Sequence, residues 1–212
     1  MKPIRFIFSS VCLMVLLIAC GSEGNSVAEC APELYPTPAT SEYILPYNIG
    51  SEFIVSQGNC TQLGHSINAF GDLRYAYDFA MPVGTEVLAA RGGEVISIVS
   101  GFANGNLTGN EANFIAIQHS DGTIAQYVHL ANRSEFVTIG QFISQGDPIG
   151  LSGDTGVTSA PKLHFELIEN PLGSCIVNAN IANCQSIPLT FSNIENQDIP
   201  LIEGQSYIAK SF

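Results

Sequence analysis

The chain has 212 residues, 46% of them hydrophobic, which is enough for one folded domain with a core and some accessory segments. Lys and Arg number 7 against 19 Asp and Glu, so the formal net charge is −12. A surface this acidic repels nucleic acid and anionic lipid headgroups, and neither is expected as a direct partner.

Residues 1–19 have the layout of an export signal. The stretch MKPIRFIFSSVCLMVLLIAC begins with two cations and continues with an apolar run too short for a comfortable transmembrane helix. LIAC, at Leu17–Cys20, is similar to the lipobox of bacterial lipoproteins, which implies cleavage before Cys20 and a lipid on its sulfur. No aspartate follows Cys20, so the resemblance implies an outer-membrane anchor facing the periplasm. The alternative is an ordinary signal peptide with an incidental cysteine.

Residues 20–45 contain three prolines and many small polar residues, with little periodicity. This composition predicts a flexible tether between the lipid and a folded domain over residues 46–212.

Four cysteines remain once Cys12 is removed with the signal and Cys20 carries the lipid. An even set in an exported chain favours disulfides. Cys175 and Cys184 bracket a short segment and are expected to pair with each other, which leaves Cys30 with Cys60. The tight two-residue spacings of a cysteine-based zinc site are absent.

Short β-rich runs separated by turn signals such as RGG, SDG and SGDTG fill the region after residue 46. Many short strands at close spacing predict an all-β fold, an antiparallel sheet or sandwich. A carrier domain of the lipoyl or biotinyl type is a weak alternative for GQFISQGDPIG, because such a domain needs its lysine at a hairpin tip and Lys162 stands in a strand. The predicted strands are 52–56, 75–81, 85–90, 93–100, 113–119, 123–130, 136–139, 148–153, 162–168 and 187–191.

Asp78 and the few histidines are the candidates for metal chemistry. Asp78 lies among apolar and aromatic residues in RYAYDFAMPVGT, where an ionised carboxylate needs a cation. His164 lies in the apolar run KLHFEL, and His129 ends AQYVHL. Catalytic zinc takes three protein ligands from His, Asp or Glu and keeps one position for water. A single strand histidine is more often a hydrogen-bonded core residue, so the order of these residues matters more than any one of them.

Four stretches follow one another in the chain: AYDFAMPVGTEVLAARGGEVISI, IQHSDGTIAQYVHL, GQFISQGDPIGLSGDTG and APKLHFEL. In this order they resemble the lysostaphin/LytM-type zinc metallopeptidases, and the similarity runs from about residue 60 to 170. The resemblance implies an antiparallel β core with a zinc groove, and endopeptidases that cut the peptide crosslinks of bacterial peptidoglycan.

Roles carry over residue by residue. Asp78 matches the aspartate ligand, and His164 matches the second histidine of the family's HLH, which is a ligand. His129 matches the histidine of the tyrosine-x-histidine-leucine strand, one of two catalytic histidines that do not bind the metal. His119 matches a common turn position and is expected to be structural.

Two positions depart from the family pattern. Arg74 stands where the first ligand is usual, four residues before Asp78, so the nearest upstream histidine, His65, is expected to bind instead; otherwise it is a solvated loop histidine. Lys162 replaces the first histidine of HLH and, as residue i−2 in a strand, shares a face with His164. A protonated lysine cannot act as a general base, but it can stabilise an oxyanion.

Two functions follow from the resemblance. The first is a lipid-anchored Zn²⁺ endopeptidase in which His65, Asp78 and His164 bind the metal while His129 and Lys162 are catalytic. The second is a degenerate relative that binds wall peptides or regulates another cell-wall hydrolase, with Lys162 pointing outward or filling the site.

Overall fold

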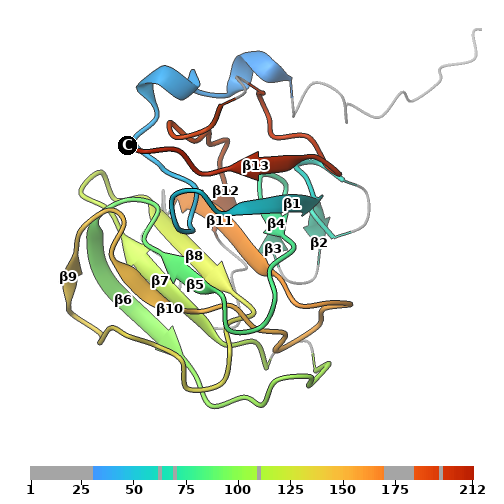
Figure 1. Cartoon of the computed structure of the whole chain (residues 1–212), viewed down its shortest axis with the longest axis vertical. Coiled ribbons are helices and arrows are strands. Elements are labelled where there is room, and N and C mark those ends of the chain that lie inside the picture. The colour runs from blue at the N-terminus through green and yellow to red at the C-terminus, as the bar shows by residue number, and fades with distance from the viewer. Residues whose placement is uncertain (1–30, 62–63, 69–70, 109–110, 170–183, 196–197) are drawn as a thin grey trace, which may run out of the picture.

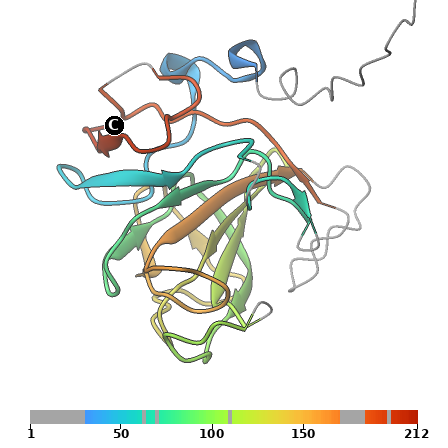
Figure 2. The same ribbon diagram turned by 90° about the vertical axis from the view of Figure 1, so that its right-hand side faces the viewer.

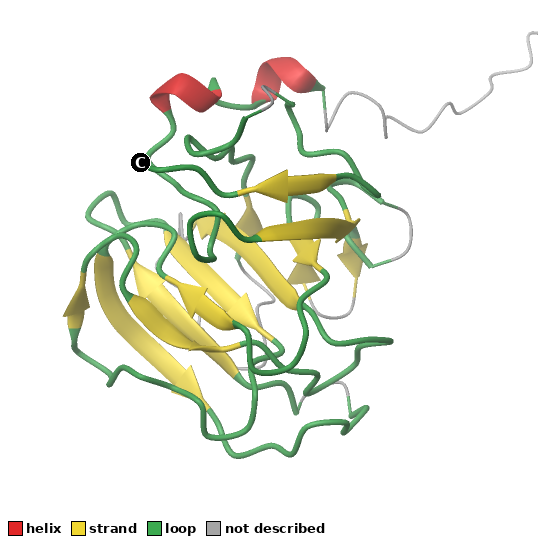
Figure 3. Ribbon diagram, viewed as in Figure 1, coloured by secondary structure: helices red, strands yellow, loops and turns green. Residues whose placement is uncertain are grey.

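The computed structural model describes residues 31–61, 64–68, 71–108, 111–169, 184–195 and 198–212. Two short 3₁₀ helices, η1 (Pro32–Leu34) and η2 (Pro38–Thr40), come first, and strands and loops make up the rest (Figure 3). None of the helices in these ranges is long and apolar enough to cross a bilayer.

Most strands belong to one antiparallel sheet, with the order β13-β1-β4-β11-β8-β7-β6-β9 and with β12 paired to β11 (Figure 1). Two small antiparallel pairs, β10–β5 and β2–β3, accompany it. The strand bounds are β1 Glu52–Gln57, β2 Ile67–Asn68, β3 Gly71–Asp72, β4 Tyr77–Phe79, β5 Glu86–Leu88, β6 Gly93–Val99, β7 Phe114–Gln118, β8 Ile124–Val128, β9 Phe142–Ile143, β10 Pro148–Leu151, β11 Leu163–Glu169, β12 Gln185–Ser186 and β13 Ser206–Ile208.

The two faces of the main sheet differ because side chains alternate along a strand. On β11, Leu163, Phe165 and Leu167 enter the main hydrophobic core, while His164 and Glu166 lie on the other face. The pair β5–β10 packs over the core side of the sheet, as Figure 1 shows, and brings Val87 and Ile149 into the same cluster. Each of these core side chains contributes about 1.5–3 kcal/mol on burial.

The observed architecture confirms the predicted all-β antiparallel fold. The observed strands differ from the predicted ones at the shortest elements. Residues 136–139 and 187–191, predicted as strands, are loops, and β9 and β13 lie where no strand was expected. Strands of two or three residues are set by the partner they meet across the sheet, and the local sequence carries little signal for them.

Part of the stretch expected to be a tether is folded onto the domain. Tyr43 and Leu45 are buried in the main core, and Leu45 N–H donates to Asn193 Oδ1 at 2.7 Å. Arg91 holds the segment through Glu42 at 2.7 Å and through the ring of Tyr43. The folded region therefore starts before residue 46.

The predicted signal (1–19), the lipid site Cys20, and the cysteines Cys30 and Cys175 lie outside the described residues. Each predicted disulfide includes one of these cysteines, so both pairings stay predictions. β13 is an edge strand of the main sheet, and η1 and η2 lie at the same end of the molecule as β13 (Figure 1, Figure 2).

Candidate metal centre

Asp78 and His164 meet because β4 and β11 are neighbours in the sheet. Their Cα positions are directly paired in the antiparallel register, and both side chains lie on the face opposite the main core. His164 Nδ1 is 2.8 Å from Asp78 Oδ1. Both residues are buried, with exposed fractions of 1% for Asp78 and 7% for His164.

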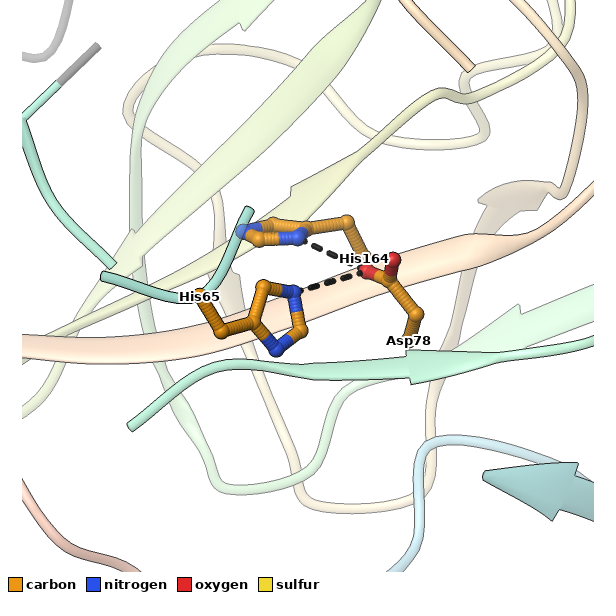
Figure 4. A group of neighbouring side chains, drawn as sticks. All are labelled: His65, Asp78 and His164. Carbon is orange, nitrogen blue, oxygen red and sulfur yellow. Dashed lines mark hydrogen bonds and ion pairs between the residues drawn. The ribbon is translucent and has the colours of Figure 1, made fainter. Parts of the chain in front are cut away.

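His65 reaches the same carboxylate from the loop between β1 and β2. Its Nε2 lies 3.3 Å from Asp78 Oδ1, and Figure 4 shows both imidazoles directed at that oxygen. One ligand atom from each of His65, Asp78 and His164 can be chosen so that all three lie within 4.8 Å of one another. The structure therefore brings together the three residues expected to bind metal.

The state of His65 fits a metal ligand. Its Nδ1 lies 2.8 Å from the carbonyl oxygen of Gly58, and a carbonyl can only accept, so Nδ1 carries the hydrogen. Nε2 is then the nitrogen left for a metal, and within the described residues no hydrogen bond reaches this buried atom. Metal-binding histidines commonly donate their other N–H to a backbone carbonyl in this way.

The donor set also fits zinc. Two imidazole nitrogens and one carboxylate oxygen are zinc ligands, and a set of three leaves one position open. Two ligands bound to tetrahedral zinc at about 2.1 Å lie about 3.4 Å apart. The separation of 3.3 Å between His65 Nε2 and Asp78 Oδ1 is close to that value.

Asp78 is ionised in this setting. Burial alone would raise its pKa, but the hydrogen bond with His164, the contact with His65 and the nearby charge of Lys162 hold the pKa of Asp78 well below its usual value. Burial lowers the pKa of His164, and its hydrogen bond to Asp78 only partly opposes this. A neutral imidazole such as that of His164, beside an ionised carboxylate, is in the protonation state that binds a metal.

Lys162 points into the same space as His164, as the strand alternation predicted. Its Nζ lies 2.6 Å from Asp78 Oδ2, and its side chain is 18% exposed. The outward-pointing orientation considered for Lys162 is therefore not the one observed. The two oxygens of Asp78 divide their partners: Oδ1 faces the histidines and Oδ2 faces the ammonium.

His129 lies beside this cluster, directly after β8. Its ring centroid is 6.0 Å from that of His164, and its Nδ1 is 2.7 Å from the carbonyl oxygen of Thr155. Burial, with the charges of His164 and Lys162, lowers the pKa of His129 to about 4. His129 is therefore neutral near pH 7, which a proton acceptor requires.

His119 and Arg74 lie outside the cluster. His119 Nδ1 is hydrogen-bonded to Gly92 O at 2.9 Å and its ring packs against Tyr43, in keeping with the structural role expected for it. Arg74 forms a bidentate ion pair with Asp72, at 2.7 and 2.8 Å, so the position of the usual first ligand is occupied by a structural cation.

Sequence reasoning missed Glu166. It lies two residues after His164 on the same face and is 1% exposed, and neither carboxylate oxygen has a hydrogen-bond partner among the described residues. Burial, together with the charges of Asp72 and Asp78, raises the pKa of Glu166 to about 8. An acid inside the apolar run KLHFEL was the available signal, the same one that pointed to Asp78.

Comparison with known proteins agrees with this geometry. Residues 72–174 match the model of peptidase family M23. Peptidoglycan DD-endopeptidase ShyA of Vibrio cholerae is 37% identical over 114 residues, covering 52% of this chain and 24% of ShyA. Lysostaphin of Staphylococcus simulans is 36% identical over 101 residues, covering 47% of this chain and 19% of lysostaphin.

Among solved structures, the catalytic domain of lysostaphin from Staphylococcus simulans aligns at 30% identity with a TM-score of 0.43. The alignment covers 66% of this chain and 88% of that domain. The chain spans about a quarter of the length of ShyA and about a fifth of lysostaphin. On the family model and the shared sequence, the chain belongs to peptidase family M23.

Proposed function

We propose that this chain is a zinc metalloendopeptidase that hydrolyses peptide crosslinks of bacterial peptidoglycan. The observation that carries the proposal is the convergence of His65 Nε2 and His164 Nδ1 on Asp78 Oδ1, with His65 Nε2 buried and without a hydrogen bond from any described residue. The relatives ShyA and ShyC, both named peptidoglycan DD-endopeptidases, support the substrate class.

Bound zinc would polarise the scissile carbonyl and acidify a water molecule. His65, Asp78 and His164 hold the metal. His129 is neutral near pH 7 and accepts the proton that the water gives up, then delivers it to the departing amine.

Lys162 assists electrostatically. An ammonium has three N–H donors, and Asp78 Oδ2 uses one of them. The others can donate to the carbonyl oxygen as negative charge develops on it, a kind of contact that contributes about 10²- to 10³-fold in rate.

The second candidate is a non-catalytic relative that binds wall peptides or regulates another hydrolase. The pairing of Lys162 with Asp78 favours it, because that lysine places a positive charge beside the ligand carboxylate and cannot accept a proton while protonated.

Zinc analysis and a cleavage assay on purified sacculi separate these candidates. We expect about one equivalent of zinc per chain. We also expect soluble wall fragments from the wild type and from Lys162→His, and none from His129→Ala. Release by Lys162→His together with no release by the wild type identifies the non-catalytic relative. Zinc well below one equivalent removes the metal assignment.

We also propose a lipid anchor at Cys20, supported by the sequence LIAC, and disulfides Cys30–Cys60 and Cys175–Cys184. The anchored form places the domain at the outer membrane, next to the wall. Fractionation tests this: the wild type is expected with membranes and Cys20→Ser in the soluble periplasmic fraction, whereas equal distribution of both contradicts the anchor.

A further inference from the structure

His129 has an uncommon backbone conformation, and its ring is hydrogen-bonded to a main-chain carbonyl. Its φ is 66°, in the left-handed region that residues other than glycine rarely adopt. Nδ1 lies 2.7 Å from the carbonyl oxygen of Thr155, and because a carbonyl can only accept, Nδ1 carries the hydrogen. The lone pair is then on Nε2, the nitrogen that is left for a proton of the substrate or water.

Thr155 is fixed in turn by its own side chain. It is fully buried, and its Oγ1 accepts from Asn113 N–H at 2.9 Å and donates to Leu130 O at 2.9 Å. Leu130 follows His129 directly. Thr155 therefore contacts the histidine ring through its carbonyl and the next residue through its hydroxyl.

Asn113 links the same region to the loop that follows β6. It is 1% exposed, and its side-chain amide donates to Phe102 O at 2.9 Å and to Leu130 O at 3.3 Å, while Oδ1 accepts from Phe102 N–H at 3.1 Å. Its main-chain carbonyl accepts from Leu130 N–H at 3.1 Å. Three loops, which follow β6, β8 and β10, meet at these two residues.

We propose that Asn113 and Thr155 are positioning residues that fix the tautomer and location of His129, and so keep Nε2 as the proton-accepting atom. The proposal rests on the proposed function and adds to it two residues whose hydrogen bonds run to His129, Leu130 and Phe102 and to each other. One bond of the network joins Asn113 N–H to Thr155 Oγ1, and the others end on His129, on Leu130 or on Phe102. The peptide unit between His129 and Leu130 is therefore held on both sides. Rigid placement of a proton-transfer group before the substrate arrives is worth much of the rate, and a shift of about 1 Å can cost about 100-fold.

The direct test is the tautomer of His129 in the zinc-loaded wild type, read from the ¹⁵N shifts of its imidazole. We expect the hydrogen on Nδ1. A hydrogen on Nε2 overturns the proposal, and this measurement needs neither a variant nor turnover.

Two substitutions at Thr155 extend the test. Thr155→Val keeps the branched shape but loses both hydroxyl bonds, and we expect kcat on sacculi to fall by about 100-fold with KM changed by less than about threefold. The ¹⁵N shifts should show a mixture of tautomers, with zinc still near one equivalent. Thr155→Ser restores the hydroxyl and should recover most of kcat and the single tautomer.

Thr190→Val is the matched control, because Thr190 is also buried and its hydroxyl has no hydrogen-bond partner in the part of the chain that the structure describes. It should change neither readout. If Thr155→Val lowers kcat while His129 keeps the wild-type tautomer, Thr155 is only structural and the proposal is wrong. If Thr155→Val does not fold, Thr155→Ala replaces it with the same expectations. Wild type that does not cut sacculi defeats the proposed function, and the tautomer still decides the positioning role.

Discussion

At the residue scale, Asp78 determines what the site can hold. One oxygen faces two imidazole nitrogens and the other faces an ammonium at 2.6 Å. Asp78 would share its charge between a bound cation and the ammonium of Lys162, and charges of the same sign repel strongly at short range when they are partly buried. The lysine thus stabilises the carboxylate when the metal is absent and opposes the metal when it binds.

Lys162→Gln should therefore bind zinc more tightly than the wild type, by about tenfold or more. A competition titration with a chelating dye measures the affinity. Lys210→Gln is the control, because Lys210 is exposed and paired with Glu195. Weaker binding by Lys162→Gln would contradict this. It would mean that the ion pair of Lys162 with Asp78 favours zinc binding, by positioning the carboxylate, more than the lysine charge disfavours it.

Glu166 gives a prediction about pH. Its pKa is raised to about 8 from an ordinary value of 4.5, so the folded protein binds this proton more tightly than the unfolded chain. The stability it contributes is complete below pH 4.5 and is lost as the pH rises through 8. Metal-free Glu166→Gln should then be more stable than the wild type by about 2–3 kcal/mol near pH 7, with the gain shrinking toward about pH 5. Urea unfolding at both pH values measures the difference, and a gain independent of pH would contradict the assignment.

The candidate ligands could be found from sequence because each is an ionisable residue in an apolar run or a matching motif. Strand alternation correctly placed Lys162 and His164 on one face. The contacts that set tautomers could not be found in this way. The carbonyls of Gly58 and Thr155 come from loops whose paths depend on the whole fold. Every residue has a main-chain carbonyl, so the residue types do not show which one will bind a histidine.

At the element scale, β11 joins the core to the site. Phe165 is fully buried between the rings of Tyr127 and Phe191, with centroids at 5.1 and 5.9 Å, while its neighbour His164 faces the opposite side. The long strands were predictable because burial of one or both faces requires alternating or continuous apolar residues, and the sequence shows that pattern. Their short partners were not, since pairing partners distant in sequence decide whether two or three residues form a strand.

Phe165→Ala should lower the free energy of unfolding by about 3–5 kcal/mol, because it removes a fully buried ring from a packed cluster. Phe142→Ala on the edge strand β9 is the control: Phe142 is 78% exposed, and its loss should cost less than about 0.5 kcal/mol. Equal losses in chemical denaturation would show that β11 does not carry the core as described.

At the scale of the whole molecule, the segment before the first strand closes the core. Tyr43 and Leu45 pack against the same cluster as Tyr207 near the C-terminus, although more than 150 residues separate them in sequence. The prolines and small polar residues of this stretch predicted a flexible tether through residue 45. The anchoring contacts of Leu45 with Asn193 and of Glu42 with Arg91 are long-range, and composition does not record them.

Two leucines of that stretch test where the folded part begins. Leu45 is fully buried, so Leu45→Ala should destabilise the protein by about 2–5 kcal/mol, measured by urea unfolding. Leu34 is 47% exposed in η1, and Leu34→Ala should cost less than about 1 kcal/mol. If the stretch were a free tether, both substitutions would leave the unfolding free energy unchanged. A large loss confined to Leu45→Ala places residues 43–45 in the folding unit, which leaves a shorter connection between the proposed lipid anchor and the site.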